Sequence, residues 1–475
     1  MTIKPSGATR TISGSPANNS ALIALNGADN VTIDGSQNGG TDRSLNLSFN
    51  TGSAGINLGT GSNGAQNNTV KNVNVTGYST SGNIYGIISG GNTVGANGAA
   101  NIGNRIQNNN VQTIIFGIAS LGASAANKNT GTVITQNTIG IVGTGTGGTG
   151  ILITFDDGAQ ITRNTISDIN AVGFGSAVGI NAGLGNLIST STSTGSVVSN
   201  AVITENNIGS VVHTGGFSAV GIALAASNTG TNIIANNVIS GVIGTSITAG
   251  IFVGTTTGGT QNIYHNSVSM TGDRGTNNSL FGSFGLAITG DDNPINVKNN
   301  AFYNTQTQTG PSTVGKNYAI GIGRSTFTNL SSDNNVLFSS GPQSKLAITG
   351  VLDNSNPNAL EYFALSAYRT ATGQETNSLA LDPKFISVSD LHIQSGVPTP
   401  VENRGTALAS VTTDIDGDAR NATTPDIGAD EGTFTPLAAN DVAAASIVSP
   451  IAGNVIIGGS IVSPVAVFAN NGANT

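Results

Sequence analysis

The chain of 475 residues contains no cysteine and no tryptophan, and charged residues make up only 8% of it. Without cysteine, disulfide bonds, cysteine metal ligands and cysteine nucleophiles are excluded. A charged fraction far below the usual value of about 25% is not typical of a helical globular protein, whose helices expose charged faces. The formal net charge is −8 and no basic patch is present, so we expect no nucleic acid partner.

Long apolar segments are also missing. The residues that follow Met1 predict a short strand and a turn, not the apolar core of a signal peptide. Pro450 and Pro464 interrupt the most apolar stretch, residues 442–468. No apolar run therefore reaches the roughly 18 residues of a membrane helix. We expect no membrane span, and for an exported protein the leader and the anchor would lie outside this chain.

The residues that are abundant favour turns and short strands. Gly accounts for 67 positions, and Asn and Thr are frequent. Gly and Asn suit tight turns, and neither Asn nor Thr favours helices. Ile and Val recur in short clusters, which is not typical of a disordered chain. The composition therefore predicts an all-β protein with many short strands.

A six-residue motif, apolar-x-x-Asn-x-apolar, recurs along the chain. One clear copy runs from Ile134 through Asn137 to Ile139, and a weaker first copy holds Val73 in place of the Asn. The motif predicts Asn109, Asn137, Asn164, Asn206, Asn236, Asn266, Asn300 and Asn334 as equivalent residues. Their spacing varies, which indicates a constant core with surface loops of different length.

A second motif alternates with the first and consists of an aromatic or small residue, Gly and an apolar strand. Residues 85–88 (Tyr-Gly-Ile-Ile) and 284–288 (Phe-Gly-Leu-Ala-Ile) are examples. Each repeat thus holds at least two strands and two turns. Gly at this position predicts a close backbone approach or a sharp corner.

These repeats predict a right-handed parallel β-helix, in which one coil alone has too little core to be stable and must stack on its neighbours. Stacked coils lie about 4.8 Å apart, so equivalent Asn side chains would form a hydrogen-bonded ladder. Asn also tolerates the left-handed backbone of tight turns. A β-sandwich or a β-propeller is the alternative, but propeller blades need about 40–50 residues per repeat and these units are mostly shorter.

Three regions follow from the pattern. Residues 1–340 are predicted to form the coils, 341–435 a C-terminal cap, and 436–475 a linker with the start of an adhesion-type or immunoglobulin-like β domain. Within the cap, residues 357–373 predict one short amphipathic helix. A cap is expected because the open end of a solenoid exposes strand edges.

Several cap motifs carry a family resemblance. They are Asp-Pro-Lys-Phe at 382–385, Asp-Leu-His-Ile at 390–393, an aspartate-rich run at 413–420 and Pro-Asp-Ile-Gly-Ala-Asp-Glu at 425–431. Together with the coil motifs, this ending resembles secreted parallel β-helix proteins of Bacteroidetes type, within the pectate-lyase-like superfamily fold. The resemblance covers the chain to about residue 435 and implies a secreted or cell-surface protein. Members are often anchored by a C-terminal sorting domain, which is not visible here.

Clustered carboxylates are the first candidate for chemistry, because polysaccharide-cleaving β-helix enzymes use them for acid–base work or for calcium. The candidates are Asp156, Asp157, Arg163, Asp291 and Asp292. The alternative is that both aspartate pairs are turn residues. The Gly-His-Gly and Arg-x-Lys motifs of polygalacturonase-like enzymes are absent.

A second candidate is calcium at Asp414, Asp416 and Asp418, which alternate around Gly417 like the start of a calcium loop, although the distal Glu is not at the required spacing. Alternatively, Arg420 pairs with one of these carboxylates and holds the cap together. No other cofactor is expected.

The position before each ladder Asn is mostly polar and variable, so we expect His265, Arg163 and Glu205 to face solvent. The leading hypothesis is a structural or adhesive segment with a polysaccharide or cell-surface glycan as its ligand, since Asn and Thr offer neutral hydrogen bonds. The alternative is a polysaccharide lyase or glycoside hydrolase acting on an acidic polysaccharide. The oligomeric state stays open.

Overall fold

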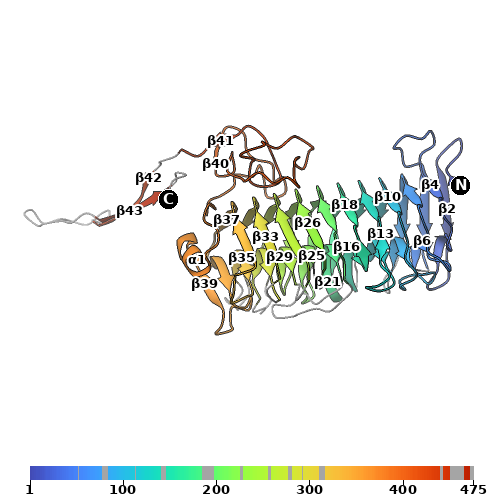
Figure 1. The fold of residues 1–475 in the computed structure, drawn as a ribbon, viewed down its shortest axis with the longest axis horizontal. Helices are drawn as coiled ribbons and strands as arrows, with labels where there is room; N and C mark the ends of the chain where they lie inside the picture. The colour runs from blue at the N-terminus through green and yellow to red at the C-terminus, as the bar shows by residue number, and fades with distance from the viewer. Residues whose placement is uncertain are drawn as a thin grey trace, which may run out of the picture.

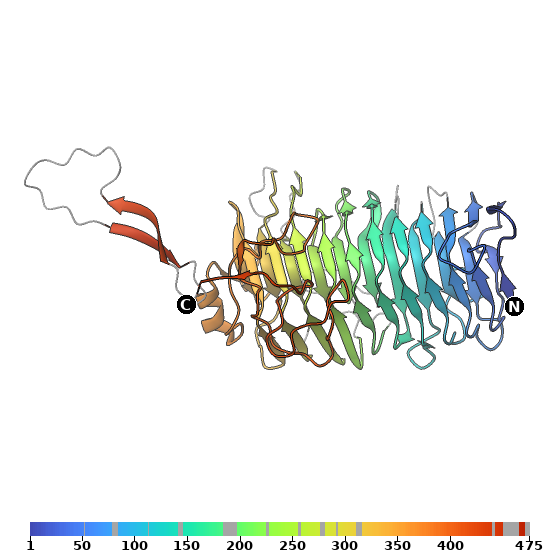
Figure 2. The same ribbon diagram turned by 90° about the horizontal axis from the view of Figure 1, so that it is seen from above.

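The computed structural model describes residues 1–51, 53–77, 84–112, 114–140, 146–183, 197–224, 228–254, 258–275, 281–290, 293–309, 316–438, 442–449 and 465–470. Within these residues the chain forms a parallel β-solenoid, seen from the side in Figure 1 and from above in Figure 2. Each coil contributes one strand to each of three long sheets, which we call sheets A, B and C in the order in which the chain visits them. The predicted parallel β-solenoid is confirmed.

The strands that share a sheet are equivalent in successive coils. Sheet A contains β1 (Thr2–Ile3), β4 (Thr32–Asp34), β7 (Thr69–Lys71), β10 (Arg105–Gln107), β14 (Val133–Thr135), β18 (Gln160–Thr162), β22 (Val202–Thr204), β26 (Thr231–Ala235), β30 (Thr260–Tyr264), β33 (Ile295–Lys298) and β36 (Leu330–Asp333). Sheet B contains β2 (Arg10–Gly14), β5 (Leu45–Phe49), β8 (Val73–Gly77), β11 (Asn110–Gln112), β15 (Thr138–Gly140), β19 (Thr165–Ser167), β23 (Asn207–Ile208), β27 (Val238–Ser240), β31 (Ser267–Met270), β34 (Ala301–Asn304) and β37 (Val336–Ser339).

Sheet C corresponds to the second sequence motif. It contains β3 (Ala21–Ala24), β6 (Ala54–Gly59), β9 (Tyr85–Gly90), β12 (Phe116–Leu121), β16 (Thr146–Thr154), β21 (Phe174–Ala182), β25 (Ala219–Leu224), β29 (Thr248–Val253), β32 (Ser283–Ile288), β35 (Asn317–Ile322), β38 (Ser344–Thr349) and the antiparallel β39 (Leu360–Tyr362). Smaller sheets join β13 (Asn129–Thr130) to β17 (Asp156–Asp157), and β20 (Ile169–Ala171) to β24 (Val211–His213) and β28 (Val242–Ile243). Parallel pairing continues through β38, so the coils extend past residue 340.

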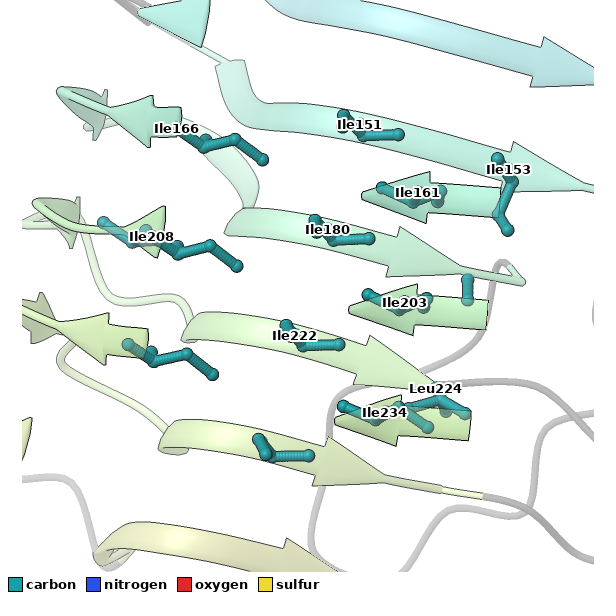
Figure 3. Packing of buried hydrophobic residues seen from close by; sticks show 14 of the residues in the cluster. Ile151, Ile153, Ile161, Ile166, Ile180, Ile203, Ile208, Ile222, Leu224 and Ile234 are labelled. Carbon is teal, nitrogen blue, oxygen red and sulfur yellow. The ribbon is translucent and has the colours of Figure 1, made fainter. Parts of the chain in front are cut away.

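The core is a set of aliphatic columns that run along the solenoid. Ile161, Ile203 and Ile234 are in register in sheet A, and the same holds for the inward residues of sheets B and C. Figure 3 shows these side chains lying over one another between the three sheets. Each fully buried aliphatic side chain contributes about 1.5–3 kcal/mol, so stability depends on the stack and not on one coil.

Glycine in sheet C permits close contact between coils. A Cβ atom built on Gly117 would lie 2.4 Å from the carbonyl oxygen of Gly150 in the next coil and 2.5 Å from a methyl carbon of Ile139. The predicted close approach at this motif is therefore confirmed.

The Asn ladder lies at the turn between sheets A and B. The side-chain oxygen of Asn164 accepts the main-chain N–H and the Nδ2 of Asn137, each at 3.0 Å, and the same pattern links Asn164 to Asn206. The observed ladder is Asn109, Asn137, Asn164, Asn206, Asn237, Asn266, Asn300 and Asn335. Val73 occupies the equivalent position at its start.

The prediction was wrong for Asn236 and Asn334, which precede the ladder residues Asn237 and Asn335. At both places two Asn residues are adjacent and apolar residues lie on both sides of them. The six-residue motif therefore matches the sequence in two alignments that differ by one residue. The structure selects the frame in which Ile234 and Ile239 face the core, while Val238 faces outward against the cap.

The left-handed conformation belongs to the residue before each ladder Asn, and not to the ladder Asn as expected. These residues, which we call the turn row, have φ between 51° and 60° and are Asn72, Asn108, Gln136, Arg163, Glu205, Asn236, His265, Asn299 and Asn334. The left-handed turn directs the turn-row side chain outward and the next side chain inward. The tight turn and the ladder thus use two neighbouring positions.

The end of the solenoid is covered by β39 and by α1 (Leu365–Thr372), which ends at Gly373 in the left-handed conformation. The expected helix is present but shorter than predicted, because residues 360–362 pair with the edge of β38 instead. Pairing that edge removes open hydrogen-bonding groups, and Leu365 and Tyr368 join the main core. No helix among the described residues has the length and apolar character needed to cross a membrane.

The remainder of the cap lies alongside the last coils, as Figures 1 and 2 show. Its apolar residues Phe385, Leu391 and Ile393 pack against Val238 and Ala301, which face outward from sheet B. Its short strands are β40 (Pro398–Thr399) and β41 (Thr435–Pro436), and an antiparallel hairpin, β42 (Val442–Ser449) and β43 (Val465–Asn470), follows.

Candidate functional site

Asp156, the first candidate for catalysis, points into the solenoid. It is 0% exposed and lies in register with Asn129. Its Oδ2 accepts hydrogen bonds from Ser120 Oγ at 2.6 Å and Thr132 Oγ1 at 2.8 Å, while its Oδ1 is buried without a partner. Burial raises the pKa of Asp156 to about 6. A raised pKa suits a general acid, but this carboxyl group cannot contact a polymer from inside the core.

The other candidates do not gather around it. Asp157, on the opposite face of the strand, accepts a hydrogen bond from Asn200 at 2.8 Å. Arg163 forms an ion pair with Glu205 of the next coil. Asp291 and Asp292 lie outside the described residues. Among the described residues, the sequence candidates form no shared catalytic centre.

We expect the buried carboxyl group of Asp156 to make the free energy of unfolding depend on pH. The pKa of about 6 in the native state exceeds the ordinary value of 3.8, so the native state holds this proton more tightly than the unfolded state. The free energy of unfolding should therefore fall as the pH rises from about 4 to about 6, by roughly 3 kcal/mol at most.

The variant Asp156→Asn should remove this dependence, since an amide still accepts from Ser120 and Thr132 and carries no charge. We expect urea denaturation to show a more stable variant at pH 8 and almost no difference at pH 4. Asp157→Asn, at the neighbouring half-buried position on the opposite face of the strand, is the control. Equal stability of wild type and Asp156→Asn at pH 8 would contradict the expectation.

His265 was expected to face solvent and is instead fully buried. Its Nε2 lies 2.8 Å from Asn299 Nδ2, and Asn299 in turn exchanges two hydrogen bonds with the main chain of Thr406 in the cap. Burial holds the pKa of His265 well below its ordinary value. The prediction for Arg163 is confirmed, because its side chain is 57% exposed. The side chain of Glu205, which was also predicted to face solvent, is only 14% exposed. His265 and Asn299 are buried where the cap covers the turn row.

The three aspartates of the candidate calcium loop have different roles. Asp414 is buried, and its carboxylate accepts the main-chain N–H groups of Asp416, Gly417, Asp418 and Glu431 at 2.8–3.0 Å. These four hydrogen bonds hold the main chain of the loop in its turn. Arg420 pairs with Glu431 at 3.1 Å and not with any of the three aspartates.

Asp416 instead lies beside His392 and Asp430. Their ligand atoms are within 4.8 Å of one another, and this is the one group of three such residues found in the described part of the chain. His392 Nδ1 contacts Asp390 at 2.5 Å and its Nε2 contacts Asp416 at 3.0 Å. Burial by itself would lower the pKa of His392, but the hydrogen bonds that the ring donates to these two carboxylates outweigh it and raise the pKa. An imidazolium bridging two carboxylates accounts for this arrangement.

A groove of about 910 Å³ separates the last coil from the cap. Asn334 lines it from the last coil, Arg369 and Asn377 line it from α1 and the segment that follows, and Glu402, Asn403, Arg404 and Thr424 line it from the rest of the cap. The sequence analysis assigned Asn334 to the ladder and did not single out the other residues, because the groove is formed by separate segments that meet only in the folded chain. No local motif could have indicated them.

Most of the lining side chains are held in place by bonds to the protein. Arg369 donates to the carbonyl oxygens of Glu375 and Ser378. Glu402 accepts from Asn403 Nδ2 and from the main chain of Phe434. The half-buried Arg404 guanidinium has no ion pair within 4.0 Å among the described residues. The groove thus combines fixed amides and hydroxyls with one cation that is available to a ligand.

Comparison with known proteins gives no family for this chain. No family model and no curated protein matches it. The surface adhesin PfbA of Streptococcus pneumoniae is similar at 12% identity and a TM-score of 0.35, over 66% of this chain and 70% of the adhesin. The A-module of the mannuronan C-5 epimerase AlgE6 of Azotobacter vinelandii is similar at 13% identity and a TM-score of 0.39, over 81% and 91%.

XylC, in a complex with xylose, is similar at 10% identity and a TM-score of 0.40, over 88% of this chain and 67% of XylC. Similarity at this level carries no argument about function. The site must therefore be interpreted from its own residues.

Proposed function

We propose that this chain is a structural and adhesive module of a secreted or cell-surface protein, and that it binds a glycan in the groove between the last coil and the cap. The observation that supports the proposal is the lining of that groove. Amides, hydroxyls and one available guanidinium surround a volume of about 910 Å³, and sites of this size take small ligands through a few fixed polar groups.

The architecture of the solenoid suits a structural role under mechanical stress. Adjacent coils are joined by three strand pairings and by a ladder hydrogen bond in the core, as for Asn137 and Asn164. Full separation of two adjacent coils would break the pairings of all three sheets and the ladder bond, so the array resists extension along its axis. The groove is lined by residues of the last coil and of α1, together with side chains of the cap that the coils lack.

A glycan array with the purified chain tests the proposal. We expect binding to at least one glycan class, and we expect Arg404→Ala to weaken it about tenfold or more, since a hydrogen bond to a charged group contributes roughly 1.5–3 kcal/mol. Arg105→Ala, at an exposed position of sheet A far along the sequence from the groove, is the matched control and should bind like the wild type.

An array without any bound glycan would contradict the binding role and leave the structural one. The chain should also be incubated with pectin and alginate in the presence of calcium. Release of oligosaccharides would favour the alternative of a polysaccharide lyase or hydrolase.

A further inference from the structure

One row of side chains on the outer face of sheet B changes character near the cap. Register pairs Ser240 with Ser269, Ser269 with Tyr303, and Tyr303 with Phe338. The rings of Tyr303 and Phe338 stack, with centroids 5.1 Å apart and planes 19° apart. On the other side of Tyr303 the next residue in the row is a serine. The aromatic stack therefore stops at Tyr303, and one face of its ring has no aromatic neighbour in the row.

A cavity of about 330 Å³ lies at this point, between the coils and the cap. Ser269 and Tyr303 line it from sheet B, and Asp382, Lys384, Phe385 and Gln394 line it from the cap. The rings of Phe385 and Tyr303 meet in an edge-type contact, with centroids 6.3 Å apart and planes 63° apart. Contacts with both Phe338 and Phe385 hold the Tyr303 ring in a fixed position.

Ser269 supplies an independent sign of a ligand. The residue is 0% exposed, yet its hydroxyl has no hydrogen-bond partner among the described residues. Buried hydroxyl groups are nearly always hydrogen-bonded, and an exception calls for an explanation. Since Ser269 lines the cavity, a polar group inside the cavity would provide the missing partner.

The opposite wall carries charge. Lys384 Nζ lies 3.2 Å from Asp382 Oδ2, and both side chains are more than one-third exposed. This pair offers an acceptor and a donor next to each other, so it can bond two neighbouring hydroxyl groups. The cavity thus has an aromatic platform, a buried hydroxyl and an exposed ion pair.

We propose that this cavity binds a single pyranose unit, which stacks its apolar C–H face on Tyr303 at the place where the aromatic row is interrupted. One sugar hydroxyl bonds Ser269 Oγ, and others bond Asp382 and Lys384. A pyranose has both the flat apolar face and the ring of hydroxyls that these walls require. The inference rests on the proposed glycan-binding role and adds a second site, separate from the groove that contains Arg404.

Ligand-observed saturation-transfer NMR tests the proposal with the methyl glycosides of glucose, galactose, mannose and xylose, each at about 10 mM to detect affinities near 1 mM. We expect transfer to the ring C–H protons of at least one glycoside. Ser269→Phe continues the aromatic row into the cavity and should reduce the transfer about tenfold or more. Ser269→Ala should weaken binding by about 3–10-fold, since one hydrogen bond is lost.

Ser48→Phe is the matched control, because Ser48 occupies the same outward row of sheet B at an exposed position in an early coil. It should bind like the wild type. Thermal melting of each variant shows whether it is folded, and Ser269→Ala, which removes one atom, covers the case in which Ser269→Phe fails to fold.

Three outcomes would overturn the proposal: no transfer to any of the glycosides, undiminished transfer in Ser269→Phe, or binding of p-cresol without binding of a glycoside. The last outcome would identify a pocket for an aromatic side chain of a protein partner. The tests of the two sites are independent of each other. If Ser269→Phe leaves glycoside binding unchanged, the cavity proposal is wrong, whereas array binding that Arg404→Ala weakens would still support the groove.

Discussion

Replacing Asn164 by alanine should lower the free energy of unfolding by about 3–5 kcal/mol. Asn164 lies within the ladder and makes hydrogen bonds to Asn137, Asn206 and the carbonyl oxygen of Ile134. Its loss leaves a main-chain N–H, a side-chain amide and a carbonyl without these partners in a region that water does not reach. Each orphaned buried group costs about 1–3 kcal/mol.

The measurement is urea denaturation followed by circular dichroism at neutral pH. Arg163→Ala is the control, since Arg163 is the adjacent residue and forms only an exposed ion pair, which contributes about 0–1 kcal/mol. A loss below 1 kcal/mol in Asn164→Ala would show that the ladder does not join the coils energetically.

Replacing Arg420 by methionine should release the cap while the coils stay folded. The Arg420 guanidinium donates to Glu431 at 3.1 Å, to the main-chain oxygen of Gly428 at 2.9 Å and to Asn236 of the turn row at 2.7 Å. Side-chain exposures of 2% for Arg420 and 9% for Glu431 make this a buried pair. Removing one partner of a buried pair costs about 3–5 kcal/mol, because the other charge stays buried.

Limited proteolysis and hydrogen exchange would measure this release. We expect cleavage between residues 380 and 435 and faster exchange at the amides of His265 and Asn299, which the cap covers. Adding Glu431→Gln to the variant should restore part of the docking, because no unpaired charge remains. Lys384→Ala, which breaks an exposed pair in the same cap, should leave the protease pattern unchanged, and equal sensitivity of both variants would refute the special role of Arg420.

The aspartate pair at 156–157 shows why local patterns mislead about a site. Two adjacent acids in a chain with few charged residues predict a reactive cluster, yet strand geometry directs Asp156 into the core and Asp157 to the opposite side. The sequence could not show which of the two faces inward, because Asp156 lies outside the six-residue motif. The strand pairing places Asp156 beside Asn129 of the preceding coil and thereby shows that Asp156 is the residue that faces inward.

His265 and Arg404 show a second limit of local sequence patterns, because contacts with distant parts of the chain decide their surroundings. His265 belongs to the same turn row as the exposed Arg163, and only the docking of residues more than a hundred positions later buries it. Arg404 has no motif around it and becomes a groove residue because the cap folds back toward the last coil.

The sequence by itself determined the coil, because a repeated inward aliphatic residue and a repeated Asn have no favourable place except over their equivalents in the next coil. It also indicated a cap, through motifs that end the repeat. Only the tertiary structure decided the frame of the ladder at Asn237 and Asn335, the path of the cap along sheet B and the two cavities beneath it. The physical reason is distance along the chain: coil stacking is a contact between neighbouring repeats, whereas the grooves arise where residues near 400 meet coils formed by residues near 270 and 330.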